Sequence, residues 1–347
     1  MRDVGALAGV SLKTVSRVVN GEPGVSAELV ARVQDAIRLL GYRHNMTAST
    51  LRRADQKSAT IGLLLEDVAN PFSSALHRAI EDAARQRNVL VFAGSSDEDV
   101  HQQRAALKAF GLRRVDGFII VPAGGDHGDL HLERLKGRPL VFVDRPATVP
   151  DADSVTVDNR AAARRAVHHL SDHAHRHIAF LGDLRSIWTA AERYAGYVEG
   201  LATRGIRLDP ELVRFDLHGI GAAERATLEL LALPHPPTAV FTGQNLVTIG
   251  AVRALKQMQA QHRVALIGFD EILLADLLDP PVSAIAQNPP AIGKAAAELL
   301  FARMDGDEQP AQHVVVPTTL ISAGFRRAAL SLTENRAKSV DRNSLYT

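Results

Sequence analysis

The stretch DVGALAGVSLKTVSRVVNG, residues 3–21, decides the fold of the N-terminal part of the chain. Apolar residues recur in it at helical spacing on both sides of a Gly-Val-Ser turn at residues 9–11. We therefore predict helices over residues 3–8 and 11–20, the second of them capped by Ser11. A third helix is predicted over residues 26–40, with Gly41 ending it. Helices this short are unstable alone, so the three must pack together.

The second of these helices carries side chains suited to reading DNA. Lys13 and Arg17 can approach guanine acceptors in a major groove. Hydroxyl and amide groups on the same helix can reach phosphates, and these belong to Thr14, Ser16 and Asn20. The alternative is a three-helix interaction module with no DNA partner.

Charge is uneven along the chain. Residues 1–57 hold nine basic and five acidic residues, a net charge of +4, whereas the remainder holds 31 basic and 34 acidic residues, a net charge of −3. A basic head on a slightly acidic body favours a polyanionic partner for the head alone. An ordinary solvated surface is the alternative for this asymmetry.

The pattern changes after a polar, basic segment at residues 42–59, which is typical of a linker. Apolar strand candidates then alternate with amphipathic helices, and they cover residues 60–65, 89–93, 117–121, 140–143, 178–181, 239–241 and 264–267. This alternation predicts doubly wound α/β lobes, whose parallel sheets bind ligands at the carboxyl ends of their strands. The length of the body predicts two lobes, and clefts between lobes are favoured sites for small molecules.

Composition narrows the class of protein. The 347 residues are 46% apolar and 23% charged, which is ordinary for globular domains. The absence of cysteine excludes disulfides and thiolate metal sites. With no apolar run of bilayer length and no signal pattern at the start, we expect a cytoplasmic protein with no membrane partner.

The opening stretch resembles, almost residue for residue, the helix-turn-helix of the LacI/GalR family of bacterial regulators. Further motifs recur at the family's spacing through nearly the whole chain, among them Asn70-Pro71-Phe72, Asp144-Arg145, Asp158-Asn159 and Gly268-Phe269-Asp270. The resemblance implies a homodimer that binds a pseudo-palindromic operator and usually represses transcription. A small-molecule effector, expected to be a sugar or sugar derivative, would control it from a body like that of periplasmic sugar-binding proteins.

The resemblance also implies a domain plan. A DNA-binding domain covers residues 1–44, a hinge 45–57, an effector-binding and dimerisation domain 58–327, and a tail 328–347. Lobe 1 would comprise residues 58–156 and 289–325, and lobe 2 residues 157–288. By resemblance the base-reading positions are Leu12, Lys13 and Arg17, and a hinge helix would wedge Leu51, beside Arg52, into the minor groove. A local packing role in a linker is the alternative for Leu51.

Candidate effector-binding residues sit where strands end or where the chain crosses between lobes. Carboxylates, amides and arginines with an aromatic face suit a polyhydroxylated ligand. The candidates are Asn70, Phe72, Asp144, Arg145, Asp158, Trp188, Arg193, Asn245, Asp270 and Gln287. Each has the alternative role of a helix cap or a satisfied buried polar group.

Two further chemistries are not expected. The histidines of residues 168–177 could suggest a metal cluster, but histidines near a helix C-terminus are stabilised by its dipole without a metal. Phosphate-binding glycine loops, the Gly-x-Ser-x-Gly elbow and the His-Glu-x-x-His motif do not occur, so the sequence supports no catalysis. We therefore expect a non-enzyme without metal or cofactor.

Overall fold

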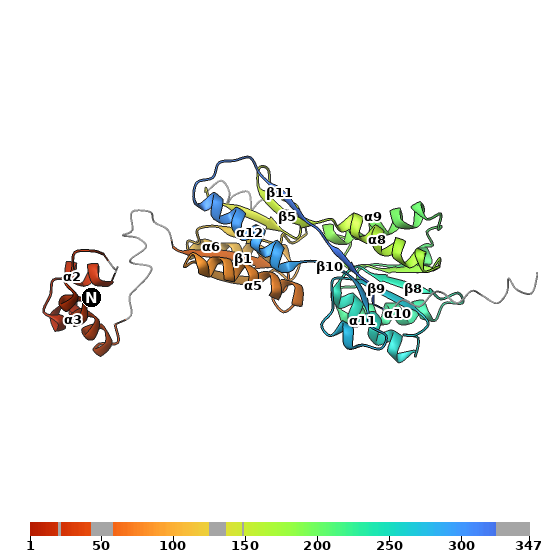
Figure 1. The fold of residues 1–347 in the computed structure, drawn as a ribbon, viewed down its shortest axis with the longest axis horizontal. Helices are drawn as coiled ribbons and strands as arrows, with labels where there is room; N and C mark the ends of the chain where they lie inside the picture. The colour runs from red at the N-terminus through yellow and green to blue at the C-terminus, as the bar shows by residue number, and fades with distance from the viewer. Residues whose placement is uncertain (20–21, 43–57, 125–136, 148, 324–347) are drawn as a thin grey trace, which may run out of the picture. The chain divides into compact units, whose positions relative to one another are not determined.

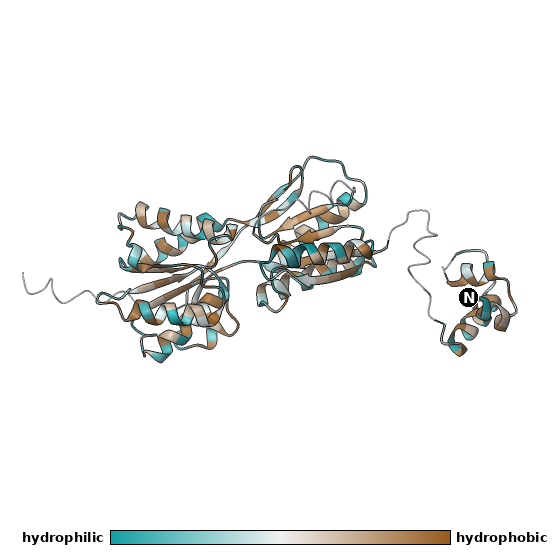
Figure 2. Cartoon of the chain, turned by 180° about the vertical axis from the view of Figure 1, so that it is seen from behind, coloured by the Kyte–Doolittle hydropathy of each residue, from teal (hydrophilic) through white to brown (hydrophobic). Residues whose placement is uncertain are grey.

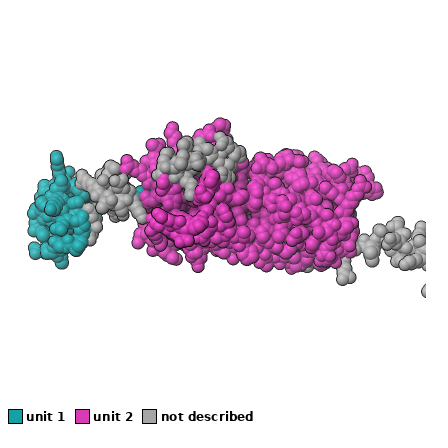
Figure 3. Space-filling view, turned by 90° about the horizontal axis from the view of Figure 1, so that it is seen from above, with its two compact units in different colours: residues 1–58 teal, residues 59–347 magenta. Residues whose placement is uncertain are grey.

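The computed structural model describes residues 1–19, 22–42, 58–124, 137–147 and 149–323 (Figure 1). The chain divides into two compact units, Met1–Ser58 and Ala59–Thr347, coloured separately in Figure 3. We call them the head and the body and describe each by itself. No helix in the described ranges combines the length and the apolar character that a membrane crossing requires.

The head is a bundle of three helices, α1 (Arg2–Ala8), α2 (Leu12–Val19) and α3 (Ala27–Leu39). The three predicted helices are thus confirmed to within a residue or two at each end. They share a small core in which Val15 and Val33 are fully buried, together with Val4, Ala8 and Ala36. This common core explains how such short helices are stable.

Local signals set the ends of the head helices. Gly9 ends α1 in the left-handed region at φ 63°, which costs glycine little. The Thr14 amide donates to Ser11 Oγ at 3.2 Å, so Ser11 caps α2 as predicted. Ser26 caps α3 in the same way, through the Leu29 amide. The Arg32 guanidinium donates to the Ala8 carbonyl at 2.6 Å and so ties α3 to the end of α1.

Lobe 1 of the body is a six-stranded sheet in the order β11-β5-β4-β3-β1-β2, and every neighbouring pair is parallel. Its strands are β1 (Thr60–Leu65), β2 (Leu90–Ser95), β3 (Phe118–Ile120), β4 (Leu140–Val143), β5 (Asp153–Val157) and β11 (His313–Val316). Helices α5 (Pro71–Gln86) and α12 (Pro289–Met304) cover one face of the sheet, and α6 (Val100–Leu112) covers the other.

Lobe 2 repeats this plan with the strand order β12-β10-β9-β8-β6-β7. Its strands are β6 (Ile178–Leu181), β7 (Val213–Arg214), β8 (Ala239–Thr242), β9 (Ala265–Phe269), β10 (Ser283–Ala286) and β12 (Thr319–Ile321). Helices α8 (Asn159–Asp172) and α9 (Trp188–Thr203) pack on one face, and α10 (Ile220–Leu231) and α11 (Asn245–Gln257) on the other. Short 3₁₀ turns, η1 (Pro210–Leu212) and η2 (Ala275–Leu277), complete the lobe.

The inner strands β1, β3, β4, β6 and β8 are buried on both faces, as parallel strands between helical layers must be, whereas the edge strands β2 and β12 are partly exposed. In β1, Ile61 and Leu63 pack toward α5 and α12, whereas Leu64 packs toward α6. This alternation follows from the two-residue period of a strand. Figure 2 shows the result, because the strands are mainly apolar in colour while the helices mix apolar and polar residues.

One predicted boundary is wrong. Residues 289–325 were predicted to belong to lobe 1, but β12 pairs antiparallel with β10 in the lobe 2 sheet. The chain therefore crosses between the lobes three times, after β5, after β10 and after β11. The five strands β5, β7, β10, β11 and β12 were not among the strand candidates. They are short or carry polar and small residues, so their apolar pattern is weak.

Several predictions fall outside the described residues. These are the phosphate-contacting Asn20, the hinge residues Leu51 and Arg52 within 45–57, and the tail 328–347.

Candidate functional site

Three of the predicted effector-binding residues, Asp144, Asp270 and Gln287, lie around a fourth, Arg193, which α9 of lobe 2 holds 5% exposed. Its Nε donates to Asn159 Oδ1 at 2.8 Å, and its Nη1 donates to the Gly243 carbonyl at 2.8 Å. The guanidinium also lies 3.9 Å from Asp270 Oδ2, and its carbon is 3.7 Å from the centre of the Phe269 ring. Arg193 thus links the ends of β8 and β9 to the first turn of α8.

Two further predicted residues extend this group. The Gln287 side chain donates from Nε2 to Asp270 Oδ1 at 2.6 Å, which leaves Gln287 Oε1 buried without a hydrogen-bond partner in the described structure. Asp144, at the end of β4 in lobe 1, interacts electrostatically with Arg193 of lobe 2. A buried acceptor without a hydrogen bond costs free energy, so a ligand that donates a hydrogen bond to Gln287 Oε1 would remove this cost.

A pair of amides joins the lobes directly. Asn245 Nδ2 donates to Asn70 Oδ1 at 2.8 Å, and Asn70 Nδ2 donates back to Asn245 Oδ1 at 3.4 Å. Both side chains are buried, at 8% and 3% exposure. Asn70 also caps α5, because its Oδ1 accepts from the Phe72 amide at 3.0 Å. We call Asn70, Asp144, Arg193, Asn245, Asp270 and Gln287 the interlobe polar group.

Burial dominates the electrostatics of this group. The pKa of Asp144 and that of Asp270 are both raised, mainly because burial disfavours the charged form, while Arg193 lowers both. Both aspartates also adopt left-handed backbone angles, φ 68° and 69°. Such angles are uncommon outside glycine, although aspartate tolerates them better than most residues. The lobes therefore contribute equivalent carboxylates from equivalent strand ends.

A second cluster, also at strand ends, was missed by the sequence analysis, apart from Arg145. We call it the acidic end, and it comprises Glu66, Glu98, Arg145, Asp183, His218 and Gln244. Arg145 is 6% exposed and forms a two-pronged ion pair with Glu98, and its Nε lies 3.7 Å from Asp144 Oδ2. In lobe 2, Asp183 Oδ1 lies 3.0 Å from His218 Nδ1, and Asp183 Oδ2 accepts from Gln244 Nε2 at 2.9 Å.

Two side chains of the acidic end, Glu66 and His218, have raised pKa values. Burial and the nearby Glu98 raise the pKa of Glu66 to about 7. The hydrogen bond from His218 to Asp183 raises the pKa of His218 to about 8, against the opposing effect of burial. Glu66 and Glu98 of lobe 1 add to the shift of His218 in lobe 2, so the acidic end also spans the two lobes.

We expect the body to lose stability as pH rises from 5 to 8. A group whose pKa is higher in the folded than in the unfolded protein stabilises the fold below its unfolded pKa, and that contribution is lost as pH rises through the folded pKa. Glu66 loses its contribution between about 4.5 and 7, and His218 between about 6.5 and 8. Urea unfolding followed by the fluorescence of Trp188, the chain's single tryptophan, measures the change.

Glu66→Gln isolates the larger part of this pH dependence. The variant should be more stable than the natural protein by about 2 kcal/mol at pH 8 and unchanged at pH 4.5. Glu298→Gln is the matched control, because Glu298 is exposed on α12. Equal pH profiles for the natural protein and Glu66→Gln would contradict the assignment.

Three predicted residues have other partners or surroundings. Asp158 accepts from Arg165 Nη1 at 2.6 Å and from Thr318 Oγ1 at 2.8 Å. It therefore holds the segment between β11 and β12, where the chain crosses between the lobes for the third time. Phe72 packs half-buried against the core. Trp188, the first residue of α9, is 37% exposed. Their roles in effector binding stay predictions.

Asn159 was missed because it follows Asp158 at the start of a helix, a position at which a capping role for either residue is equally plausible from sequence. Glu66, Glu98, Asp183 and Gln244 carried a usable signal, since each comes one to three residues after a strand. His218 lies four residues after β7, which was not predicted.

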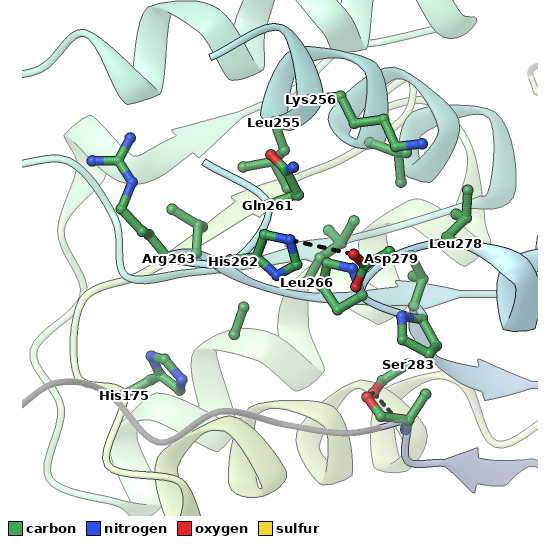
Figure 4. A pocket seen from close by; sticks show the side chains of 17 residues that line it. His175, Leu255, Lys256, Gln261, His262, Arg263, Leu266, Leu278, Asp279 and Ser283 are labelled. Atoms are coloured by element: carbon green, nitrogen blue, oxygen red, sulfur yellow. Dashed lines mark hydrogen bonds and ion pairs between the residues drawn. The ribbon is translucent and has the colours of Figure 1, made fainter. Parts of the chain in front are cut away.

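A separate cavity of about 430 Å³ lies in lobe 2, among the end of α11, the start of β9 and the segment before β10. Figure 4 shows His262 beside Asp279, an ion pair of 3.7 Å, with Gln261 and Leu266 nearby. None of the predicted effector residues lines it. This cavity is at the amino end of β9, whereas the interlobe polar group is at the carboxyl ends of the strands.

The head presents the predicted base-reading side chains outward. Leu12 is 47% exposed and Lys13 is exposed, whereas Val15 of the same helix is fully buried. The Arg17 side chain is 44% exposed and lies 3.6 Å from Glu22. Among the residues that the structure covers, no group of three or more histidine or acidic side chains is arranged to hold a metal ion.

Comparison with known proteins gives two family matches. Residues 1–45 match the description "Bacterial regulatory proteins, lacI family", and residues 167–324 match "Periplasmic binding protein-like domain". The HTH-type transcriptional repressor CytR of Escherichia coli (strain K12) is 30% identical over 330 residues, which cover 94% of this chain and 96% of CytR.

Solved structures agree with this match. The lac repressor dimer bound to operator and the anti-inducer ONPF has a TM-score of 0.81 at 25% identity and covers 94% of this chain and 98% of its own. A complex of the transcriptional regulator CelR with cellobiose has a TM-score of 0.70 at 27% identity, with the same two coverages. The head, the two lobes and the full-length match together place this chain in the LacI family of bacterial transcriptional regulators.

Proposed function

We propose that the protein is a homodimeric, operator-binding repressor whose DNA affinity is set by a small, polyhydroxylated effector held at the interlobe polar group. The observation that carries this proposal is Arg193, buried in lobe 2 with two acceptors, an aromatic face and a carboxylate around it, and in electrostatic interaction with Asp144 of lobe 1. A guanidinium beside a carboxylate and amides can pair with the hydroxyls of a sugar. The cellobiose complex of CelR supports this class of effector.

Effector control acts through lobe closure. The Asn70–Asn245 hydrogen bond brings the two lobes into direct contact. A ligand shifts the balance of closed and open forms only by its difference in affinity for the two. A footprint of the full-length protein on operator DNA, with and without candidate sugars, tests the proposal. Protection of two symmetric half-sites that a sugar alters is expected, and a single asymmetric half-site would overturn it.

On DNA, α2 lies in the major groove, where Leu12, Lys13 and Arg17 read bases. Thr14 and Ser16 contact phosphates, with Asn20 completing the set, and Leu51 with Arg52 enters the minor groove from the hinge. The exposure of the Leu12, Lys13 and Arg17 side chains supports this division. Because its partner is the operator, the protein works in the cytoplasm as a regulator without catalysis.

Arg17→Ala should relax the preference for one base pair. The expected loss of discrimination is about 1 to 3 kcal/mol at that position, because a two-pronged arginine contact to guanine is removed. Binding to a panel of operators with single base changes measures it. Thr14→Val is the control and should weaken all operators alike, so equal losses across the panel for both variants would contradict the assignment.

An apolar patch on lobe 2 supports the homodimer. Leu273, Leu274 and Leu277 are 81%, 59% and 73% exposed around η2. The neighbouring surface is a hollow that Leu273, Leu274 and Ile321 help to line. Neighbouring exposed leucines of this kind mark an interaction surface.

Leu277→Asp should therefore convert the dimer into a monomer. A charge at the centre of an apolar interface costs several kcal/mol, since it is buried without a partner. Sedimentation of the full-length protein measures the change, and Leu112→Asp, at an exposed leucine of lobe 1, is the control. An unchanged dimer for Leu277→Asp would place the interface elsewhere.

A transport-type sugar-binding protein is the rival function. It would share the two lobes but would have no use for the exposed basic helix of the head. A head that fails to bind any duplex DNA, in a chain that still binds a sugar, would favour this rival.

A further inference from the structure

The cavity of lobe 2, away from the interlobe polar group, forms a second candidate site. It has a volume of about 430 Å³ and lies where α11 ends, where β9 begins and just before β10. Volumes of about 300 to 1,000 Å³ are typical of pockets that hold small molecules. Asp270 and Gln287 follow the opposite ends of β9 and β10. A ligand in this cavity would therefore be separate from the effector at the interlobe polar group.

Most of the side chains that line the cavity are apolar. They include Leu255, Leu266, Leu278, Pro281 and Val282. Apolar walls favour an apolar molecule, because contact with them removes apolar surface from water. The main part of a ligand for this cavity should therefore be apolar, in contrast with a polyhydroxylated effector.

Two basic side chains of the lining have no acidic partner. Lys256 lies in the last turn of α11 and Arg263 lies before β9, and both are exposed. In the part of the chain that the structure describes, neither side chain forms a hydrogen bond or an ion pair. Asp279 also lines the cavity, but its Oδ2 already lies 3.7 Å from His262 Nε2. The charge of the lining therefore favours an anionic ligand.

Gln261 adds an acceptor that needs a donor. It lines the cavity together with Lys256 and Arg263, which lie on either side of it in the view of Figure 4. Its Oε1 is buried without a hydrogen-bond partner among the described residues, and a buried acceptor in this state costs free energy. Because no protein donor fixes this oxygen, the amide can turn to accept a hydrogen bond from a ligand hydroxyl.

We propose that the cavity is a second ligand site, which binds a small hydroxy acid with an apolar body. Lys256 and Arg263 attract the carboxylate of this ligand, and Gln261 Oε1 accepts a hydrogen bond from its hydroxyl. The apolar body packs against side chains such as Leu255 and Leu266. This inference goes beyond the proposed function, because it concerns a different site and a different class of ligand.

Calorimetric titration of the full-length protein tests each part of the proposed ligand. The probes are 3-phenyllactate, its amide, 3-phenylpropionate and lactate, together with 2-hydroxyoctanoate, its amide and octanoate. In at least one series the hydroxy acid should bind about tenfold or more tightly than its uncharged amide. It should bind about threefold or more tightly than the acid without the hydroxyl. Lactate, which has almost no apolar body, should not bind measurably.

Substitutions in the lining locate the bound acid. A variant that combines Lys256→Gln and Arg263→Gln should bind the hydroxy acid no more tightly than its amide. Both side chains are exposed and without partners, so this variant should fold normally. Arg253→Gln is the matched control, because Arg253 is exposed on α11 beside Glu224 and does not line the cavity. Val252→Trp, which places a large ring in the cavity, should abolish binding.

A second copy of the chain is the alternative occupant of the cavity. Pro281, Val282 and Ala323 line both the cavity and the hollow beside the apolar patch at Leu277. If the acids bind to the monomeric Leu277→Asp variant but not to the dimer, the second copy covers the cavity and the proposal is wrong.

The remaining outcomes are equally decisive. Equal affinity for a hydroxy acid and its amide in both series would overturn the assigned charge class. Unchanged binding by the variant without Lys256 and Arg263 would place the acid elsewhere. If no probe binds, the second site does not exist. None of these results affects the proposed function, which is judged from the operator footprint with and without sugars.

Discussion

Arg193→Ala is expected to abolish the effector response of the protein. The substitution removes the donors to Asn159 and to the Gly243 carbonyl and the cation beside Asp270. Asp270 would then be a buried carboxylate without a cation, which costs about 3 to 5 kcal/mol. We expect the affinity for the effector to fall by more than about 100-fold and the body to melt at a lower temperature.

Two further variants make this test specific. Arg193→Lys keeps the positive charge but loses the forked geometry, so it should restore part of the stability and little of the effector affinity. Arg160→Ala is the control, because Arg160 lies on the neighbouring helix α8 in exposed ion pairs with Glu192 and Glu199. Normal effector binding by Arg193→Ala would contradict the placement of the ligand.

Val15→Asp is expected to abolish operator binding and leave the body intact. Val15 is fully buried in the small core of the head, so the aspartate would place an unpaired charge among Val4, Val33 and Ala36. A bundle of three short helices has little stability to lose, and the head should unfold. We expect operator affinity to fall by more than about 100-fold.

The body supplies the internal control for Val15→Asp, because the head and body are separate compact units. The melting temperature of the body and its effector affinity should be unchanged. Leu39→Asp, at a head residue 79% exposed, should retain a folded head. A folded head in Val15→Asp, shown by its helical circular dichroism, would contradict the packing described for α2.

Local patterns were enough to predict the head and the α/β alternation. The head helices depend on spacing and caps such as Ser11 and Gly9, which are properties of neighbouring residues. Strand candidates such as residues 60–65 and 140–143 are continuous apolar runs, because these strands are buried on both faces. Strands such as β12 are short and their pairing is decided by partners far along the chain, so residues 319–321 were placed in the wrong lobe.

The candidate site, like the fold, could be predicted only where local sequence patterns determine it. Strand ends pointed to Asn245 and Asp270, and the structure brings both into the interlobe polar group. The sequence could not show that Asp158 accepts a hydrogen bond from Thr318, 160 residues away. Nor could it show that the neighbouring Asn159 accepts one from Arg193. Partner choice over such distances depends on the folded geometry of both lobes. The cluster of Glu66, Asp183 and His218 likewise appears only when the strand ends of two sheets are considered together.

The amide pair that joins the lobes has a mechanical consequence. Asn70 precedes the first turn of α5 and Asn245 is the first residue of α11, so their hydrogen bond brings two helix N-termini together. Each N-terminus carries roughly half a positive charge, and like charges repel. The repulsion between the two N-termini therefore opposes the contact between the lobes, and the hydrogen bonds of the Asn70–Asn245 pair offset it. An electron-rich group of a ligand placed between these two N-termini would therefore favour the form in which the lobes are in contact.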